Sequence, residues 1–157
     1  MNATSTGSQT LAARMLTDAY DYVLSGWCQG AAAHDECGRP VEPASAFARR
    51  WSALGALERA WRRSPEPPGV TLDAFQRAKL ALTAAVNDLP QVWNDRSERH
   101  ESDVLSALAE AVGLVDLPVA VPPSALDDLL EDLDTVGPRW GLDDGFLTDL
   151  AEPPLER

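Results

Sequence analysis

Four segments of this chain repeat their apolar residues at steps of three and four, the spacing that places side chains on one face of an α-helix. These segments are residues 9–25, 45–63, 71–89 and 101–112. No stretch alternates apolar and polar residues for long enough to predict a strand, and the best candidate contains prolines. The sequence therefore predicts an all-α fold, a compact bundle of about four helices with an acidic, partly helical C-terminal extension.

Composition divides the chain into three predicted parts. Residues 1–8 are polar and uncharged and predict a disordered N-terminus, residues 9–115 form the helical domain, and residues 116–157 form an acidic linker and helical tail. The net charge is −12, and the last part alone holds eleven acidic residues and two arginines. Because binding to a phosphate backbone depends on Lys and Arg, this balance argues against nucleic acid as a partner.

The sequence lacks two features that would indicate a membrane or secreted protein. No apolar run reaches the roughly 18 residues that a membrane span needs, which argues against a membrane partner. The N-terminal residues also lack the basic and apolar regions of a secretory signal. With only two cysteines, the sequence favours a cytoplasmic protein whose thiols stay reduced.

The loop GWCQGAAAHDECGRP, residues 26–40, holds both cysteines and one of the two histidines. Cys28, His34 and Cys37 are competent zinc ligands, but a structural site needs four ligands and the fourth is not evident. A catalytic Cys28 needs a base or a helix N-terminus to lower its thiol pKa, and it follows the end of a predicted helix instead. The interpretation we favour is that Cys28 is a small buried residue beside Trp27.

Five tryptophans predict either a Trp-rich helical core or the walls of a ligand pocket. In the pocket interpretation, Trp27 and Trp51 form walls, and Gln29, Asn94 and Asp95 supply polar groups. In the alternative, Asn94 and Asp95 cap a turn that follows the third helix. Turn chemistry favours the cap, and both interpretations stay open.

Three motifs follow one another in the chain: SGWCQG with a later GRPV, then RRWSALGAL, then VWND ahead of a helix that starts ESDV. In this order they resemble a family of small actinobacterial and phage proteins of unknown function, over about residues 11–112. The resemblance implies an all-helical domain without an assigned activity. It implies recurring positions at Trp27, Cys28, Gly30, Trp51, Leu54, Gly55, Leu57, Trp93, Asn94 and Asp95.

Gly55 is notable among these positions, because a glycine inside a helix costs about 1 kcal/mol relative to alanine. Close helix packing, or a ligand against that backbone, would justify it. Together with the tryptophan analysis, the recurring positions predict a ligand-binding set. Its members are Trp27, Cys28, Gln29, Trp51, Gly55, Trp93, Asn94 and Asp95.

The leading functional prediction is a non-catalytic interaction or accessory protein, which binds a protein partner through its Trp-rich helical domain and acidic tail. Leucines at helical spacing give the tail an apolar face that either docks on a partner or packs on its own domain. One alternative is a small-molecule binding or self-resistance protein that takes a small hydrophobic ligand, such as a secondary metabolite. Others are a cryptic cysteine-dependent enzyme that uses Cys28 with His34 or Asp95, and a tail that mimics nucleic acid. The sequence lacks the common phosphate-loop, serine-hydrolase and zinc-protease motifs, so we predict no catalytic residue, metal or cofactor.

Overall fold

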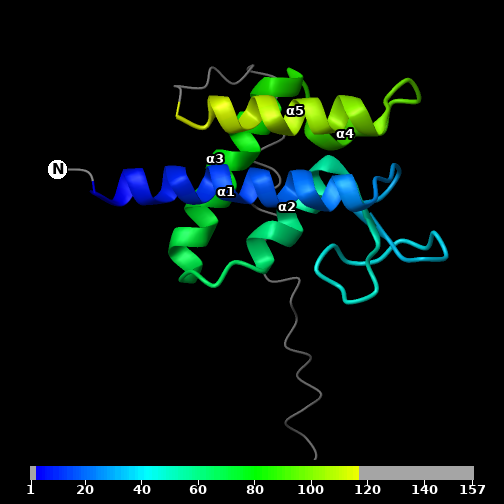
Figure 1. Cartoon of the computed structure of the whole chain (residues 1–157), viewed down its shortest axis with the longest axis horizontal. Helices are drawn as coiled ribbons and strands as arrows, with labels where there is room; N and C mark the ends of the chain where they lie inside the picture. Colours follow the sequence, from blue (N-terminus) through cyan, green and yellow to red (C-terminus); the bar gives the residue numbers. More distant parts are fainter. Residues whose placement is uncertain (1–2, 117–157) are drawn as a thin grey trace, which may run out of the picture. The chain divides into compact units, whose positions relative to one another are not determined.

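The computed structural model describes residues 3–116, and Figure 1 shows their helices with one small sheet at the end of the first helix. All of these residues belong to one compact unit. The prediction of an all-α fold is confirmed, because the strands have only two residues each. The predicted linker and tail over residues 117–157 lie outside the described residues. The elements in chain order are α1 (Ala3–Ser25), β1 (Ala33–His34), β2 (Arg50–Trp51), α2 (Ala53–Arg62), α3 (Pro68–Val86), α4 (Pro90–Asn94) and α5 (Glu101–Leu114).

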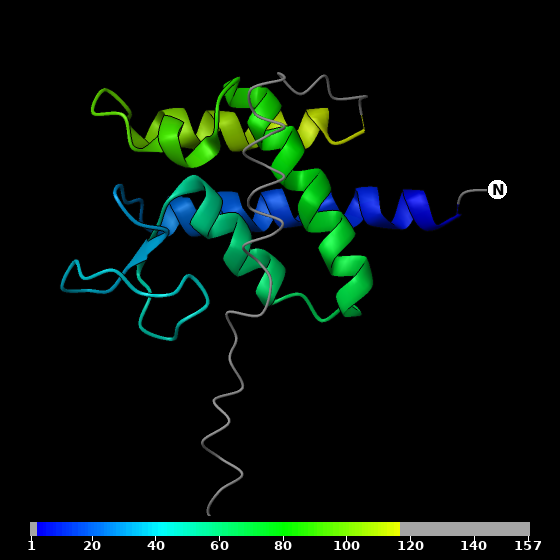
Figure 2. The same cartoon turned by 180° about the vertical axis from the view of Figure 1, so that it is seen from behind.

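Helix α1 is the element on which the others assemble. It packs against α5, α2 and α3, and Figures 1 and 2 show α5 lying beside it while α3 crosses it. Each long helix contributes a fully buried leucine to the shared core, and alanines between the leucines let the helix backbones approach closely. The largest of these buried side chains are Met15, Leu16, Leu57, Leu82 and Leu108.

Helix α1 begins at Ala3, earlier than the start at Gln9 that its apolar pattern indicates. The predicted disordered N-terminus over residues 1–8 therefore differs from the structure at residues 3–8, which are helical. None of these residues is a proline. Once packing fixes a helix, each added residue gains one backbone hydrogen bond, so a polar segment can extend it.

Helix α2, in contrast, begins later than its apolar spacing indicates. The spacing predicts a helix over residues 45–63 with Phe47 and Trp51 on the buried face, but α2 starts at Ala53. The residues before it form β2, which pairs with β1, and the Ser52 hydroxyl caps the first turn by accepting a backbone N–H at 3.1 Å. Trp51 is buried, whereas Phe47 lies on the preceding loop with 72% of its surface exposed. The prediction that Phe47 belongs to the core is therefore wrong.

The ends of α3 and α5 follow local chemistry. Helix α3 starts at Pro68. Proline suits this position because the N–H that it lacks has no partner in the first turn of a helix. Thr71, the predicted N-cap, therefore lies inside the helix. The helix ends at Val86, and the residue that caps it, Asn87, has a left-handed φ of 49°. At the start of α5, the Asp103 carboxylate accepts the backbone N–H of His100 at 2.9 Å. In this described region no helix is both long and apolar enough to cross a membrane.

Gly55 lies where α2 meets the loop that follows α1. A Cβ at this position would stand 1.8 Å from the carbonyl oxygen of Ala32. The same oxygen accepts the backbone N–H of Ser52 at 3.0 Å, so it is held in place. Close backbone packing therefore explains why this helix contains a glycine despite its lower helix propensity.

We expect Gly55→Ala to lower the free energy of unfolding by about 3 kcal/mol, because the added methyl overlaps a backbone oxygen that cannot move freely. Gly113→Ala is the matched control, since a Cβ at Gly113 meets nothing within 4 Å. Its better helix propensity should raise stability by up to about 1 kcal/mol. Urea unfolding of both variants measures the difference, and equal stabilities would contradict the packing explanation.

Candidate functional site

The side chain of Asn94, at the end of α4, lies at the centre of the predicted site residues and is fully buried. Its Oδ1 accepts the indole N–H of Trp27 at 3.0 Å and the backbone N–H of Ala53 at 3.1 Å. Its Nδ2 donates to the carbonyl oxygen of Cys28 at 3.1 Å and to Oδ1 of Asp95 at 2.9 Å. Both donors and both lone pairs of the amide are therefore used. We call Trp27, Cys28, Ala53, Asn94 and Asp95 the Asn94 junction.

Gln29 and Asp95 extend these contacts between α4 and the loop after α1. The Gln29 side-chain amide donates to the carbonyl oxygens of Asn94 and Arg96, both at 2.8 Å. The Asp95 carboxylate accepts the backbone N–H of Gly30 at 3.0 Å. Asp95 also ends α4, so it both terminates a helix and ties that helix to a segment far away in the chain.

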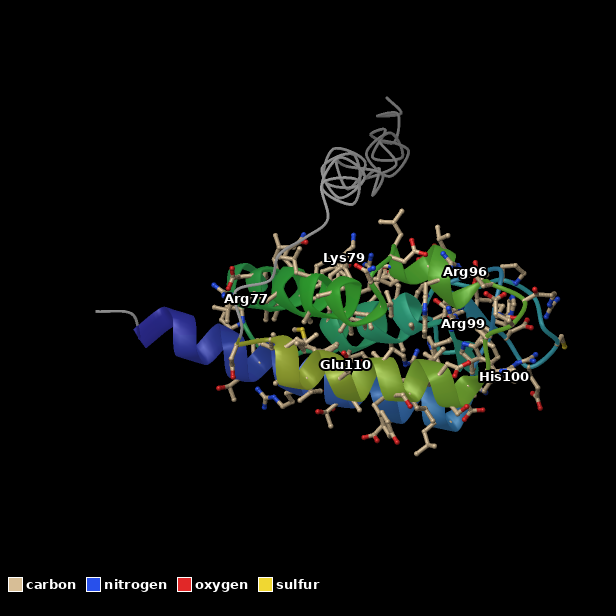
Figure 3. The ribbon with its side chains drawn as sticks, turned by 90° about the horizontal axis from the view of Figure 1, so that it is seen from above. Arg77, Lys79, Arg96, Arg99, His100 and Glu110 are labelled. Atoms are coloured by element: carbon tan, nitrogen blue, oxygen red, sulfur yellow. The ribbon has the colours of Figure 1, made fainter. Side chains whose placement is uncertain are left out.

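Within the described residues, Trp51 and Trp93 are buried and make contacts of their own near the Asn94 junction. Trp51 is buried and donates its indole N–H to the carbonyl oxygen of Pro43 at 3.0 Å. Its backbone pairs with the Trp27 segment, because its carbonyl oxygen accepts the N–H of Cys28 at 3.1 Å. Trp93 is buried beneath the guanidinium of Arg99, which lies 4.4 Å from the ring centroid, and Figure 3 shows Arg99 at the α4–α5 end of the molecule.

Three residues that support this site were not predicted. The Ser52 hydroxyl donates to the side-chain oxygen of Gln91 at 2.9 Å, and Gln91 in turn donates to Asp95 at 2.9 Å. The third is Arg59, whose Nη1 donates to the carbonyl oxygens of Pro43 at 2.8 Å and Ser45 at 3.0 Å. The serine just before an apolar run was a readable N-cap signal, but nothing in the sequence marks the long-range partners of Gln91 or Arg59.

Cys28 and Cys37 have different surroundings. Cys28 is buried and Cys37 is exposed. Burial raises the pKa of the Cys28 thiol to about 11, with a smaller opposing effect from Arg50. Among residues 3–116, no three His, Cys, Asp or Glu side chains are grouped as ligands of a metal ion.

Asp35 organises the tip of the loop that carries His34 and Cys37. Its carboxylate accepts the backbone N–H groups of Cys37 and Arg39, both at 2.9 Å, and the Nε of Arg39 at 2.9 Å. These contacts, led by the backbone hydrogen bond from Arg39, lower the pKa of Asp35. The loop tip is therefore a turn closed around a charged aspartate.

A hollow of about 500 Å³ lies on the surface of this same loop. Its apolar part includes Pro40, Val41 and the exposed ring of Phe47, and Cys37 and Arg49 also line it. We call these five residues the Phe47 surface. None of the eight predicted site residues lines this hollow, and their assignment to ligand binding stays a prediction.

The fold and these contacts define a small helical domain in which a buried asparagine connects three distant segments. The chain belongs to a family of unknown function (DUF6197), whose model matches residues 7–114. This match contains all three motifs and confirms the resemblance to a family of unknown function. In the comparisons with curated proteins and with solved structures, nothing matches the chain.

We expect Asn94→Asp to lower the free energy of unfolding at neutral pH by about 3 kcal/mol, because a buried carboxylate would replace two satisfied donors and face the carbonyl oxygen of Cys28. Asn87→Asp is the control at an exposed position; its new negative charge at the C-terminal end of α3 should cost no more than about 1 kcal/mol. Chemical denaturation measures both variants, and a loss for Asn94→Asp no larger than the control's would contradict a central role for this amide.

The deficit of the Asn94→Asp variant should depend on pH. Burial raises the pKa of the new carboxyl in the folded state above its unfolded value of about 4. The folded state then favours the protonated acid, whose O–H can donate to Cys28 as the amide did. The stability loss should therefore shrink as the pH falls from 7 toward about 4 and grow as it rises. A loss that stays constant over this range would contradict burial of the new group.

We expect iodoacetamide to modify native Cys37 and not native Cys28, because alkylation requires an accessible thiolate. Mass spectrometry of the native protein should show one adduct on Cys37, and the unfolded protein should show two. Labelling of native Cys28 at the rate of Cys37 would restore the cysteine-dependent enzyme as a candidate.

Proposed function

We propose that this protein is a non-catalytic interaction protein that binds a protein partner through the Phe47 surface. The observation that carries this proposal is Phe47 itself, a large aromatic side chain with 72% of its surface exposed. Burying such a ring on association removes a large apolar area from water, and aromatic residues are enriched among the residues that dominate binding energy.

The loop that presents Phe47 is held firmly from beneath. The carbonyl oxygen of Pro43 accepts two hydrogen bonds, from the Trp51 indole and from Arg59. Arg59 is only 8% exposed, and its guanidinium lies 4.8 Å from the ring centroid of Trp51 and 5.0 Å from that of Tyr22. A loop fixed in this way loses little conformational entropy when it binds, which favours recognition.

The hollow next to Phe47 suits an apolar side chain of the partner. Pro40 and Val41 supply its apolar wall, while Glu36, Arg39 and Arg49 place charged groups around it. An apolar centre with a polar rim is the usual anatomy of a protein interface. The partner chemistry that fits is therefore one apolar anchor surrounded by polar groups.

The buried thiol of Cys28 and the internal hydrogen bonds of Asn94 and Asp95 favour this proposal over a cysteine-dependent enzyme. A thiol with a pKa of about 11 is protonated at neutral pH and is a poor nucleophile. The acidic residues 116–157 remain part of the proposal as a second contact for a basic partner. We also propose a cytoplasmic location, on the small number of cysteines.

We expect Phe47→Ala to weaken partner binding at least about thirtyfold, which corresponds to roughly 2 kcal/mol at an aromatic anchor. The matched control is Leu24→Ala, which removes another exposed apolar side chain, 57% exposed on α1. Both variants should keep the melting temperature of the native chain, because neither side chain belongs to the core. The measurement is quantitative co-purification from the cells that make the protein, followed by titration of the enriched partner. Equal enrichment by Phe47→Ala and the unchanged chain would remove the Phe47 surface as the binding site.

A further inference from the structure

The Phe47 surface combines a projecting ring and an apolar hollow on one patch. The ring of Phe47 is 72% exposed, and it lines the hollow of about 500 Å³ whose other apolar walls are Pro40 and Val41. Figures 1 and 2 show the loop between β1 and β2, which carries these residues, projecting from one end of the helix bundle. A patch that holds both features can pair with a copy of itself, because two-fold symmetry places each ring opposite the other hollow.

The charges around the hollow are balanced. Asp35 and Arg39 form an ion pair with each other at 2.9 Å, so their charges compensate within one copy. One acid, Glu36, and one base, Arg49, are left, and both are exposed. Within residues 3–116, neither of these two side chains forms an ion pair. Arg49 donates to two backbone carbonyl oxygens of its own loop, at 2.8 and 2.9 Å, which leaves its charge uncompensated.

This balance distinguishes between kinds of partner. The chain carries a net charge of −12, so two copies repel each other in general, and least where acids and bases are equal in number. At the hollow, a basic partner would meet Arg49 and an acidic partner would meet Glu36, each with a charge of the same sign. A second copy offers an arginine to the acid and a glutamate to the base. It also supplies the apolar anchor that fits the hollow, which is Phe47.

We infer that the partner is a second copy of this chain, and that two copies form a symmetric dimer through the Phe47 surface. The inference rests on the proposed function, because it identifies the partner of the same surface. Phe47 of each copy enters the hollow of the other, and Glu36 of each copy faces Arg49 of the other. Eight residues line the hollow, whereas a stable interface uses about 20–30 residues on each side, so the dimer is weak and reversible.

Sedimentation equilibrium of the full chain measures this association. The unchanged chain should pass from monomer to dimer between about 1 μM and about 500 μM, the range in which weak interfaces form. Phe47→Ala removes a ring from both halves of the dimer, so the thirtyfold loss expected for one ring applies twice and dimerisation should weaken about a thousandfold. Leu24→Ala is the matched control and should dimerise like the unchanged chain, since Leu24 lies on α1 and does not line the hollow.

An exchange of charges tests the two-fold symmetry. Glu36→Arg and Arg49→Glu should each weaken dimerisation about tenfold, because like charges then meet at two equivalent places. An equimolar mixture of these two variants should dimerise like the unchanged chain, since each introduced charge meets an opposite charge in the mixed dimer. Glu42→Arg is the matched control, because Glu42 is exposed on the same loop and does not line the hollow. All variants should keep the melting temperature of the unchanged chain.

A chain that stays monomeric over the whole concentration range, or a dimer that Phe47→Ala leaves unchanged, would overturn the inference. A mixture of the two charge variants that associates no better than either variant alone would do the same. If Arg49→Glu fails to fold, the comparison of Phe47→Ala with Leu24→Ala still decides the result. The proposed function is tested separately, because a monomeric chain can still enrich a different protein in a way that depends on Phe47.

Discussion

One buried amide joins three segments of this chain that lie far apart in the sequence. Asn94 contacts the segment after α1 through Trp27 and Cys28, and the first residue of α2 through its backbone N–H. An amide can do this because it offers two donors and two acceptors in one plane. A buried polar group is costly unless every one of these is satisfied, so the chain must adopt this arrangement at the Asn94 junction or lose stability there.

The helices could be predicted from the sequence because their signal is local. The stripe in residues 9–25 places Met15 and Val23 in the core, and the stripe in residues 101–112 does so for Val104 and Leu108. The same reasoning failed for Phe47, whose spacing fits the stripe of α2 although it precedes that helix. Pairing of β2 with β1 depends on residues 16 positions or more away in the chain, and apolar periodicity contains no information about such pairing.

The candidate site could be predicted from the sequence only in part, because its long-range contacts also leave no local pattern. The motifs indicated that Trp27, Asn94 and Asp95 belong to one set of recurring positions. In the structure, Asn94 forms hydrogen bonds with both Trp27 and Asp95. The motifs do not show that the Asn94 side chain is buried. An asparagine that caps a turn at the surface would stand in the same sequence pattern. The contacts of Arg59 could not be predicted either. Its partners are backbone carbonyl oxygens, which every residue has, so the sequence does not indicate which of them it contacts.

The motif residues and the proposed Phe47 surface differ in how their side chains are used. Trp27, Cys28 and Asn94 use their polar groups on one another, so they stabilise the domain and have little capacity left for a ligand. The exposed ring of Phe47 contributes nothing to the core, yet it keeps an apolar group in water on a loop that hydrogen bonds to Pro43 hold in place. The family model matches residues 7–114, which include both the motif residues and Phe47, so the proposed binding surface rests on the exposure of Phe47 and not on the family match.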